Sequence, residues 1–245
     1  MSRPIEGAGT PEPVWRAWPP LACLPRLEPA GVRRALVVAP HPDDEVLGAG
    51  GTLAMLAADG AEVAVLALTD GEASHPGGEL QRAELGRRRA SETEEALRRL
   101  LGDGTPVDRL GLPDGELARH EEAIALAVAA RLAPGDWCLA PHHDDGHPDH
   151  EAAARAAAAA SAGAGARLIE YPVWLWHWSE PGEQAVDWSR ARRVELPVGV
   201  RARKRDAVAA FRSQLEPHGP GPGAEPVLPP GVLARFERPC EVLFT

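Results

Sequence analysis

Short apolar runs alternate with longer segments of helical periodicity along most of the chain. The runs RALVVAP at residues 34–40 and EVAVLAL at 62–68 have the length of strands, whereas residues 45–59 have apolar positions at helical spacing and are followed by Gly60. Strands that alternate with helices are typical of parallel sheets with helices on both faces. The pattern therefore predicts an α/β fold in three layers with a mostly parallel sheet.

The same alternation continues toward the C-terminus. Further strands are expected at residues 108–112, 137–140, 167–178 and 192–198. Further helices are expected at residues 79–101, 117–132, 148–161 and 201–215. Within the last of the long strands, Trp174, Trp176 and Trp178 would share one face. That face is either a wall for a sugar ring or acyl chain, or packing against helices or a second subunit, and we favour packing.

Two segments lack periodicity. Residues 1–31 are rich in proline, which predicts an extended arm laid over or ahead of the domain. Residues 217–231 (PHGPGPGAEPVLPPG) form a Gly/Pro loop that could cover a site. A length of 245 residues is ordinary for one α/β domain, so we expect a single domain over residues 1–245.

Composition and charge exclude several classes of function. The chain carries 26 basic and 36 acidic side chains, a formal charge of −10, which argues against nucleic acid as a partner. Its three cysteines have no CxxC spacing, which argues against a disulfide framework and a thiolate zinc site. Because the N-terminus lacks a signal-peptide pattern and no stretch reaches the ~20 apolar residues of a membrane span, we expect a cytoplasmic protein without a membrane partner.

Histidines and carboxylates follow two of the predicted strands. HPDDE stands at residues 41–45 and HHDDGHPDH at 142–150. The carboxyl ends of parallel strands meet at one edge of a sheet, where such folds bind their ligands. Imidazole and carboxylate suit zinc, and a catalytic zinc site uses three protein ligands. His41, Asp44 and His150 would form such a set and leave Asp43 free beside it.

Other interpretations of these residues remain open. Asp43 or Asp44 could instead cap the following helix. His142 and His143 are either ligands of a second metal or, as we favour, solvated loop residues. Imidazole and carboxylate also accept iron and other divalent ions. The GxGxxG pattern of nicotinamide enzymes is absent after the first strand.

The two HPD motifs closely resemble those of one family. APHPDDE at residues 39–45 and DGHPDH at 145–150 resemble the first and second motifs of the PIG-L/LmbE-like zinc deacetylases. Weaker echoes of the family are LTDGE at 68–72, RASE at 89–92, LPDG at 112–115 and RSQ at 212–214. The resemblance implies a Rossmann-like fold and hydrolysis of an N-acetyl or related N-acyl group, mostly on glucosamine-type sugars. It also leaves open a homo-oligomer.

The resemblance assigns a role to each matching residue. The implied ligands of one zinc ion per chain are His41, Asp44 and His150. The other implied roles are general base for Asp43, oxyanion stabiliser or proton donor for His147 (as a cation), orientation of a histidine for Asp149, and nearness to the substrate for Arg89 and Asp114.

One departure and two alternatives accompany this interpretation. Some sugar-thiol deacetylases of the family have a tyrosine where this chain has Asp145, which weakens that particular assignment. The first alternative is an amidase of a thiol-sugar conjugate or of an N-acyl natural product. The second is a glycan-binding module that contains a metal but has no turnover, although a binding site alone needs no base such as Asp43.

Overall fold

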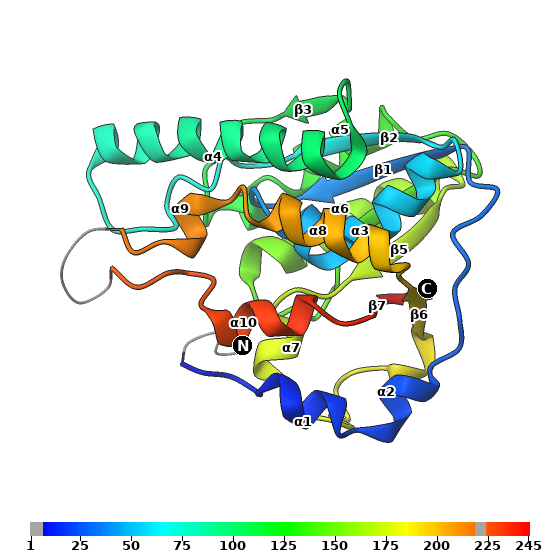
Figure 1. Cartoon of the computed structure of the whole chain (residues 1–245). Coiled ribbons are helices and arrows are strands. Elements are labelled where there is room, and N and C mark those ends of the chain that lie inside the picture. Colours follow the sequence, from blue (N-terminus) through cyan, green and yellow to red (C-terminus); the bar gives the residue numbers. More distant parts are fainter. Residues whose placement is uncertain (1–6, 219–223) are drawn as a thin grey trace.

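The fold is built around a sheet of seven strands in the order β3-β2-β1-β4-β5-β7-β6 (Figure 1). The structure is a computed structural model that describes residues 7–218 and 224–245. The strands are β1 (Arg34–Ala39), β2 (Glu62–Ala67), β3 (Val107–Arg109), β4 (Trp137–Pro141), β5 (Arg167–Tyr171), β6 (Ala191–Glu195) and β7 (Cys240–Phe244). The strands β1 to β5 are parallel neighbours, and β7 runs antiparallel between β5 and β6. The predicted α/β fold with a mostly parallel sheet is confirmed.

Helices cover both faces of the sheet. One face carries α3 (Asp44–Ala58), α4 (Glu79–Leu101) and α8 (Val198–Val208). The other face carries α5 (Glu121–Ala129) and α6 (Pro148–Ala164). The short 3₁₀ helix η1 (Leu117–Arg119) comes directly before α5. The central strand β1 shows why: Val37 packs in the core with α3, whereas Leu36 and Val38 pack with the alanines of α6. Because β1 is buried on both faces after its first residue, residues 35–39 are all apolar.

The glycines of α3 allow close packing between layers. A side chain at Gly48 would collide with the ring of Tyr171 on β5, and one at Gly51 would collide with Leu196. These glycines lie within the helix and bring it close to the sheet, so they have no phosphate-binding role.

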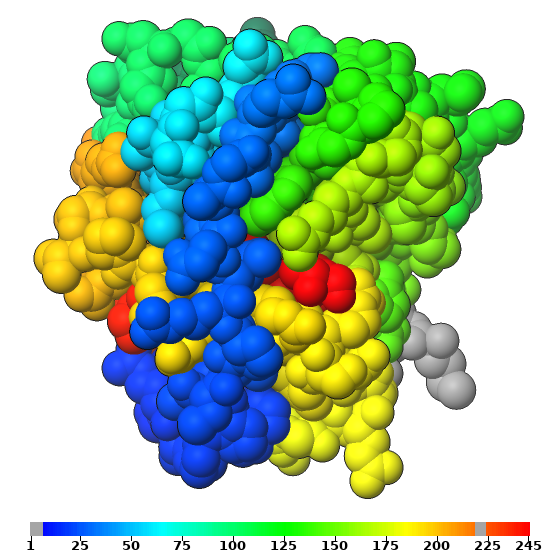
Figure 2. Space-filling model, turned by 90° about the vertical axis from the view of Figure 1, so that its right-hand side faces the viewer, coloured from blue at the N-terminus to red at the C-terminus, as the bar shows by residue number. Residues whose placement is uncertain are grey.

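A third cluster of buried residues lies beside β6 and β7. It contains α1 (Glu12–Arg16), α2 (Pro19–Cys23), α7 (Leu175–Trp178) and the 3₁₀ helix η2 (Trp188–Arg190). Trp15 of α1 is fully buried, so the segment before β1 folds against the protein where an extended arm was expected. Figure 2 shows the N-terminal segment (blue) running along one side of the molecule, where residues 25–27 hydrogen-bond Arg193 of β6. Residues 1–6 of the predicted arm lie outside the described residues.

The predicted strand at 167–178 is wrong beyond Tyr171. The backbone N–H groups of Val173, Trp174 and Leu175 all donate to the carboxylate of Asp145, and the chain turns into α7. Helical residues two positions apart point in different directions, so the three tryptophans share no face. Trp176 packs in the third cluster, whereas the Trp178 indole N–H donates to the Asp145 carbonyl at 2.9 Å.

The remaining differences lie in the boundaries and in the C-terminal part of the chain. The predicted helices at 117–132 and 201–215 are each divided, the first into η1 and α5 and the second into α8 and α9 (Arg212–Leu215). The predicted strand at 108–112 is confined to β3. Residues 219–223 of the predicted loop lie outside the described residues, and its end forms α10 (Pro230–Leu233), followed by the 3₁₀ helix η3 (Ala234–Phe236). Among the described residues, no helix combines the length and apolar character needed to cross a membrane.

Candidate metal and active site

The two HPD motifs meet where the strand order changes direction. The strands β1 and β4 are adjacent and parallel, while their next neighbours β2 and β5 extend the sheet to opposite sides. His41 follows β1, and His147 and His150 lie at the start of α6 after β4. This is the position at which open α/β sheets bind their ligands, so the structure brings the two motifs together as expected.

Three side chains, here named the metal triad, point lone pairs at one position: His41, Asp44 and His150. His41 Nδ1 lies 3.2 Å from His150 Nε2 and 3.3 Å from Asp44 Oδ2, and His150 Nε2 lies 3.2 Å from the same oxygen. Ligands of a tetrahedral zinc with bonds of about 2.0–2.1 Å are separated by about 3.3 Å. The donor set and its spacing therefore fit a divalent metal such as zinc.

The charges of the metal triad favour a cation between its members. Although burial opposes it, hydrogen bonds to carboxylates raise the pKa of His41, and Asp44 and Asp145 raise that of His150 to about 9. Although burial has the opposite effect, His150 and His41 hold the pKa of the Asp44 carboxyl well below its usual value. The site therefore attracts positive charge, which a bound metal would supply in place of protons.

Carboxylates behind the two histidines fix the ring orientation. His150 Nδ1 donates to Asp145 Oδ2 at 2.7 Å, and His41 Nε2 lies 3.3 Å from Asp149 Oδ2 and 3.1 Å from Asp114 Oδ1. Each ring thus carries its proton on the outer nitrogen and points the other nitrogen at the metal position. Asp149 lies where its expected role requires, and Asp114, expected near the substrate, contacts His41 as well.

Sequence reasoning assigned no role to Asp145. Its carboxylate is fully buried and accepts three backbone N–H groups besides the histidine ring. The sequence signal for this role was the position of Asp145, an acidic residue five positions before the candidate ligand His150. The orientation of its side chain depends on hydrogen bonds from residues 173–175, which are distant in sequence.

Asp43 occupies the position expected of a base. It is the one described residue other than glycine with a positive φ, 110°, a strained conformation that is often found at functional sites. Its side chain makes no capping hydrogen bond to α3, so the capping interpretation is not supported. Burial raises the pKa of Asp43 to about 7 against the opposing effect of Arg89.

Arg89 holds Asp43 in place. The buried guanidinium of Arg89 donates to Asp43 Oδ2 at 3.2 Å and to the carbonyl oxygens of Pro42 at 2.7 Å and Gly71 at 2.8 Å. Arg89 was expected near the substrate, and it does line the cavity described below. Its hydrogen bonds join the candidate base Asp43 to the backbone of Pro42 and Gly71.

His147 lies beside the metal triad with its ring in a defined orientation. Its Nδ1 accepts the backbone N–H of Asp149 at 3.1 Å, so the proton of a neutral ring lies on Nε2. Burial, together with His150 and His41, lowers the pKa of His147 to about 3. The structure thus favours a neutral His147 that donates a hydrogen bond from Nε2, in place of the expected cation. A protonated Nε2 has no lone pair with which to bind a metal.

A cavity of about 450 Å³ opens over these groups. Its polar walls come from the two motifs and from Arg89, Asp114, Ser74 and Gln214, and its apolar walls from Val173, Trp174, Val227 and Leu228. Trp174 is thus the member of the tryptophan series that reaches the site. Val227 and Leu228 come from the predicted Gly/Pro loop, so the described end of that loop forms one wall of the cavity.

A second group of histidines, here named the Glu170 cluster, lies nearby: His142, His143 and Glu170. Their ligand-type atoms lie within 4.8 Å of one another. His142 is only 1% exposed, so the expectation of a solvated loop residue is wrong for it. Its Nδ1 accepts the N–H of Asp144 at 3.1 Å, which leaves the proton on Nε2. Glu170 is neutralised by His143 at 2.7 Å and Arg190 at 2.5 Å, so this cluster does not fit a metal.

Comparison with known proteins relates the chain to deacetylases. Residues 36–161, just over half of the chain, match the PIG-L family, described as GlcNAc-PI de-N-acetylase. The chain is 35% identical over 130 residues to diacetylchitobiose deacetylase of Thermococcus kodakarensis, a match that covers 50% of this chain and 46% of that protein. It is 33% identical over 199 residues to 1D-myo-inositol 2-acetamido-2-deoxy-alpha-D-glucopyranoside deacetylase of Rhodococcus erythropolis, covering 71% and 66%.

Solved structures have the same fold. A conserved protein of Thermus thermophilus superposes with a TM-score of 0.61 at 30% identity, covering 86% of this chain and 93% of that one. N,N'-diacetylchitobiose deacetylase of Pyrococcus horikoshii has a TM-score of 0.58 at 23% identity, covering 76% and 72%. The resemblance drawn from the HPD motifs is confirmed, and with it the prediction of an enzyme of the deacetylase type: the chain belongs to the PIG-L family.

Proposed function

We propose that this protein removes the N-acetyl group from a glucosamine-type sugar or its conjugate, with a divalent metal, zinc by preference, held by His41 Nδ1, Asp44 Oδ2 and His150 Nε2. The observation that carries the proposal is the triangle of lone pairs at 3.2–3.3 Å with Asp43 beside it at the base of an open cavity. When bound, such a metal polarises an amide carbonyl and makes water more acidic.

The residues of the chain supply the proton transfers. The carboxylate of Asp43 takes a proton from the water whose oxygen attacks the acyl carbon. The Nε2–H of His147 donates a hydrogen bond to the oxygen that becomes negative in the tetrahedral species. The C–N bond then breaks, and the proton held by Asp43 passes to the leaving nitrogen. The products are the carboxylic acid and the free amine.

The positioning of these groups supports the same reaction. Arg89 fixes Asp43, and a carboxylate with a pKa of about 7 is suited to accept and return a proton near neutral pH. Trp174 and the polar groups of Ser74 and Gln214 offer an aromatic face and hydrogen bonds to a sugar ring.

The names of the relatives favour a 2-acetamido sugar as substrate. Diacetylchitobiose and the acetamido-deoxy-glucopyranoside of inositol both carry this group. Because both relatives are named as deacetylases, a glycan-binding module without turnover is not favoured. The thiol-sugar and natural-product amidases are distinguished from the proposed activity by the substrate panel below.

The test compares Asp43→Asn with Asp59→Asn, which lies at the opposite end of the same helix and is exposed. Amine release is measured from N-acetylglucosamine, diacetylchitobiose and an N-acetylglucosaminyl inositol, together with metal content by mass spectrometry. Asp43→Asn should lower the rate by roughly 10²–10⁴ while the metal is retained, and Asp59→Asn should change neither. Full activity of Asp43→Asn would refute the base assignment.

A further inference from the structure

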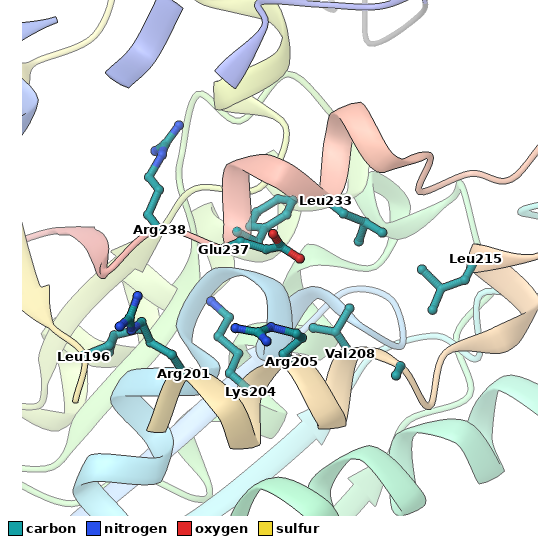
Figure 3. A pocket seen from close by; sticks show the side chains of 11 residues that line it. Leu196, Arg201, Lys204, Arg205, Val208, Leu215, Leu233, Glu237 and Arg238 are labelled. Carbon is teal, nitrogen blue, oxygen red and sulfur yellow. The ribbon is translucent and has the colours of Figure 1, made fainter. Parts of the chain in front are cut away.

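A second cavity lies between α8 and the segment that contains α10 and η3. Figure 3 shows Lys204, Arg205 and Val208 rising from α8 toward Leu233 and Glu237 on the opposite wall. Its lining shares no residue with that of the metal cavity. The second cavity is therefore separate from the proposed deacetylase site.

The cavity combines a small volume with apolar walls. It measures about 170 Å³, and its apolar side is formed by Leu196, Val208, Ala209, Leu215, Leu233 and Phe236. An apolar cavity of roughly 150 Å³ accommodates a molecule of the size of benzene. The space thus fits one six-membered ring or a short alkyl chain.

The other side of the cavity carries four cationic side chains, two of which are neutralised within the protein. Lys204 donates to Glu241 at 2.6 Å, and Arg238 donates to Glu12 at 2.7 Å. The remaining two, Arg201 and Arg205, form no ion pair within residues 7–218 and 224–245, and the carboxylate in the lining, Glu237, lies on the opposite wall.

One donor of the Arg201 guanidinium lacks an acceptor where water does not reach. The Nε of Arg201 is buried and has no hydrogen-bond partner in the described part of the chain. A buried donor without an acceptor is costly, and a guanidinium is satisfied best by the two oxygens of a carboxylate. A bound anion would supply the missing acceptor.

We propose that this cavity binds a small organic anion, a monocarboxylate whose apolar body has about the size of one ring. The carboxylate lies against Arg201 and Arg205, and the apolar body packs on Val208, Leu215 and Leu233. Neither half of the site suffices alone, because exposed arginines bind any anion weakly and the apolar walls do not select for charge.

The test is calorimetric titration of the metal-loaded full chain with benzoate, and with benzyl alcohol as the neutral counterpart. We expect one benzoate per chain and at least tenfold weaker binding of benzyl alcohol, about the value of a charged hydrogen bond. N-acetylglucosamine should not displace benzoate. Absence of benzoate binding at millimolar concentration, or its displacement by the sugar, would overturn the proposal.

Variants locate the bound anion. The double variant Arg201→Gln/Arg205→Gln should weaken benzoate binding at least about tenfold, whereas Arg203→Gln, an exposed arginine of the same helix that does not line the cavity, should not. Val208→Trp, which fills the cavity and keeps both arginines, should abolish binding. Unchanged binding in the double variant would place benzoate elsewhere. Self-association of the wild type that is lost in the double variant would instead identify a carboxylate of a second copy as the occupant.

Discussion

The metal triad and the Glu170 cluster contain the same kinds of side chain, yet only one of them fits a metal. Each has two histidines and one carboxylate, and both lie near the carboxyl ends of the central strands. In the metal triad, His41 Nδ1, His150 Nε2 and Asp44 Oδ2 face one another. In the Glu170 cluster, the carboxylate is occupied by His143 and Arg190, and Nδ1 of His142 accepts a backbone N–H, so its proton lies on Nε2.

The difference originates in what lies behind each ring. Asp149 and Asp145 accept protons from the outer nitrogens of His41 and His150, which leaves their inner nitrogens free to bind a metal. The Nδ1 of His142 instead accepts the N–H of Asp144, which fixes the proton of the neutral ring on Nε2. In this protein, acceptors on the outer nitrogens of both histidines distinguish the metal triad from the Glu170 cluster.

The largest contrast is expected from removing one histidine of each group. His150→Ala should abolish metal binding and activity, because only two ligands remain. His143→Ala should leave the metal stoichiometry at that of the wild type. Metal content after dialysis and amine release measure both. Loss of metal in His143→Ala alone would invert the assignment of the two clusters.

A smaller loss of metal affinity is expected from changing Asp145, which contacts the metal triad through His150. Asp145→Asn keeps the size of the side chain and one oxygen for the N–H groups of Val173 and Leu175. It replaces Oδ2, which accepts from His150 and from the N–H of Trp174, with an amide N–H₂ group that cannot accept. Metal affinity should fall by about 10–100-fold, measured by competition with a chelator. Glu170→Gln, the same kind of change in the Glu170 cluster, is the control and should not alter it. Equal affinities in both variants would show that orientation by Asp145 is unimportant.

The sequence predicted the metal triad better than the groups that orient it. The HPD motifs identified His41, Asp44 and His150 because adjacent residues after parallel strands must meet at one sheet edge. The orienting role of Asp145 could not be predicted, because it depends on where the backbone of residues 173–175 turns. The contact between Arg89 and Asp43 likewise joins α4 to a loop through side-chain direction alone.

The fold shows the same limit. The strands β1 and β2 and the helices α3 and α4 have local patterns that specify them, and they form close to where the sequence predicted. The short strand β7 was missed, since it pairs antiparallel with two strands that are distant in sequence. The helix α7 stands where a strand was predicted, because Asp145 accepts hydrogen bonds from the backbone there and the chain turns. The helix α1 forms in the segment where Trp15 is buried against the rest of the protein.

The Glu170 cluster should contribute to the stability of the fold, whereas the metal triad is proposed to take part in catalysis. Glu170→Gln removes the charge that His143 and Arg190 share, and we expect a loss of about 1–3 kcal/mol in the free energy of unfolding. Chemical denaturation measures this loss, with Glu180→Gln, an exposed residue, as the control. A stability equal to that of the wild type would mean that the two ion pairs contribute nothing.

The smallest expected effect is the pH dependence of that loss. Hydrogen bonding to Glu170 raises the pKa of His143 above its ordinary 6.5, so this stabilisation is complete below pH 6.5 and disappears as the pH rises through the raised value. Although burial opposes it, His143, His142 and Arg190 lower the pKa of Glu170 from 4.5 to about 2, so its stabilisation is complete above pH 4.5 and disappears as the pH falls toward 2.

The stability difference between wild type and Glu170→Gln should therefore be greatest between about pH 4.5 and 6.5 and smaller on both sides. Because His143 is half exposed, the fall above pH 6.5 should be under about 1 kcal/mol. Arg190 keeps its charge throughout, so part of the difference remains at high pH. The variant His143→Gln distinguishes the two contributions. In its background, the stability difference caused by Glu170→Gln should no longer fall above pH 6.5 but should still fall below pH 4.5. A difference that rises steadily with pH in the wild-type background would show that His143 does not share the charge of Glu170.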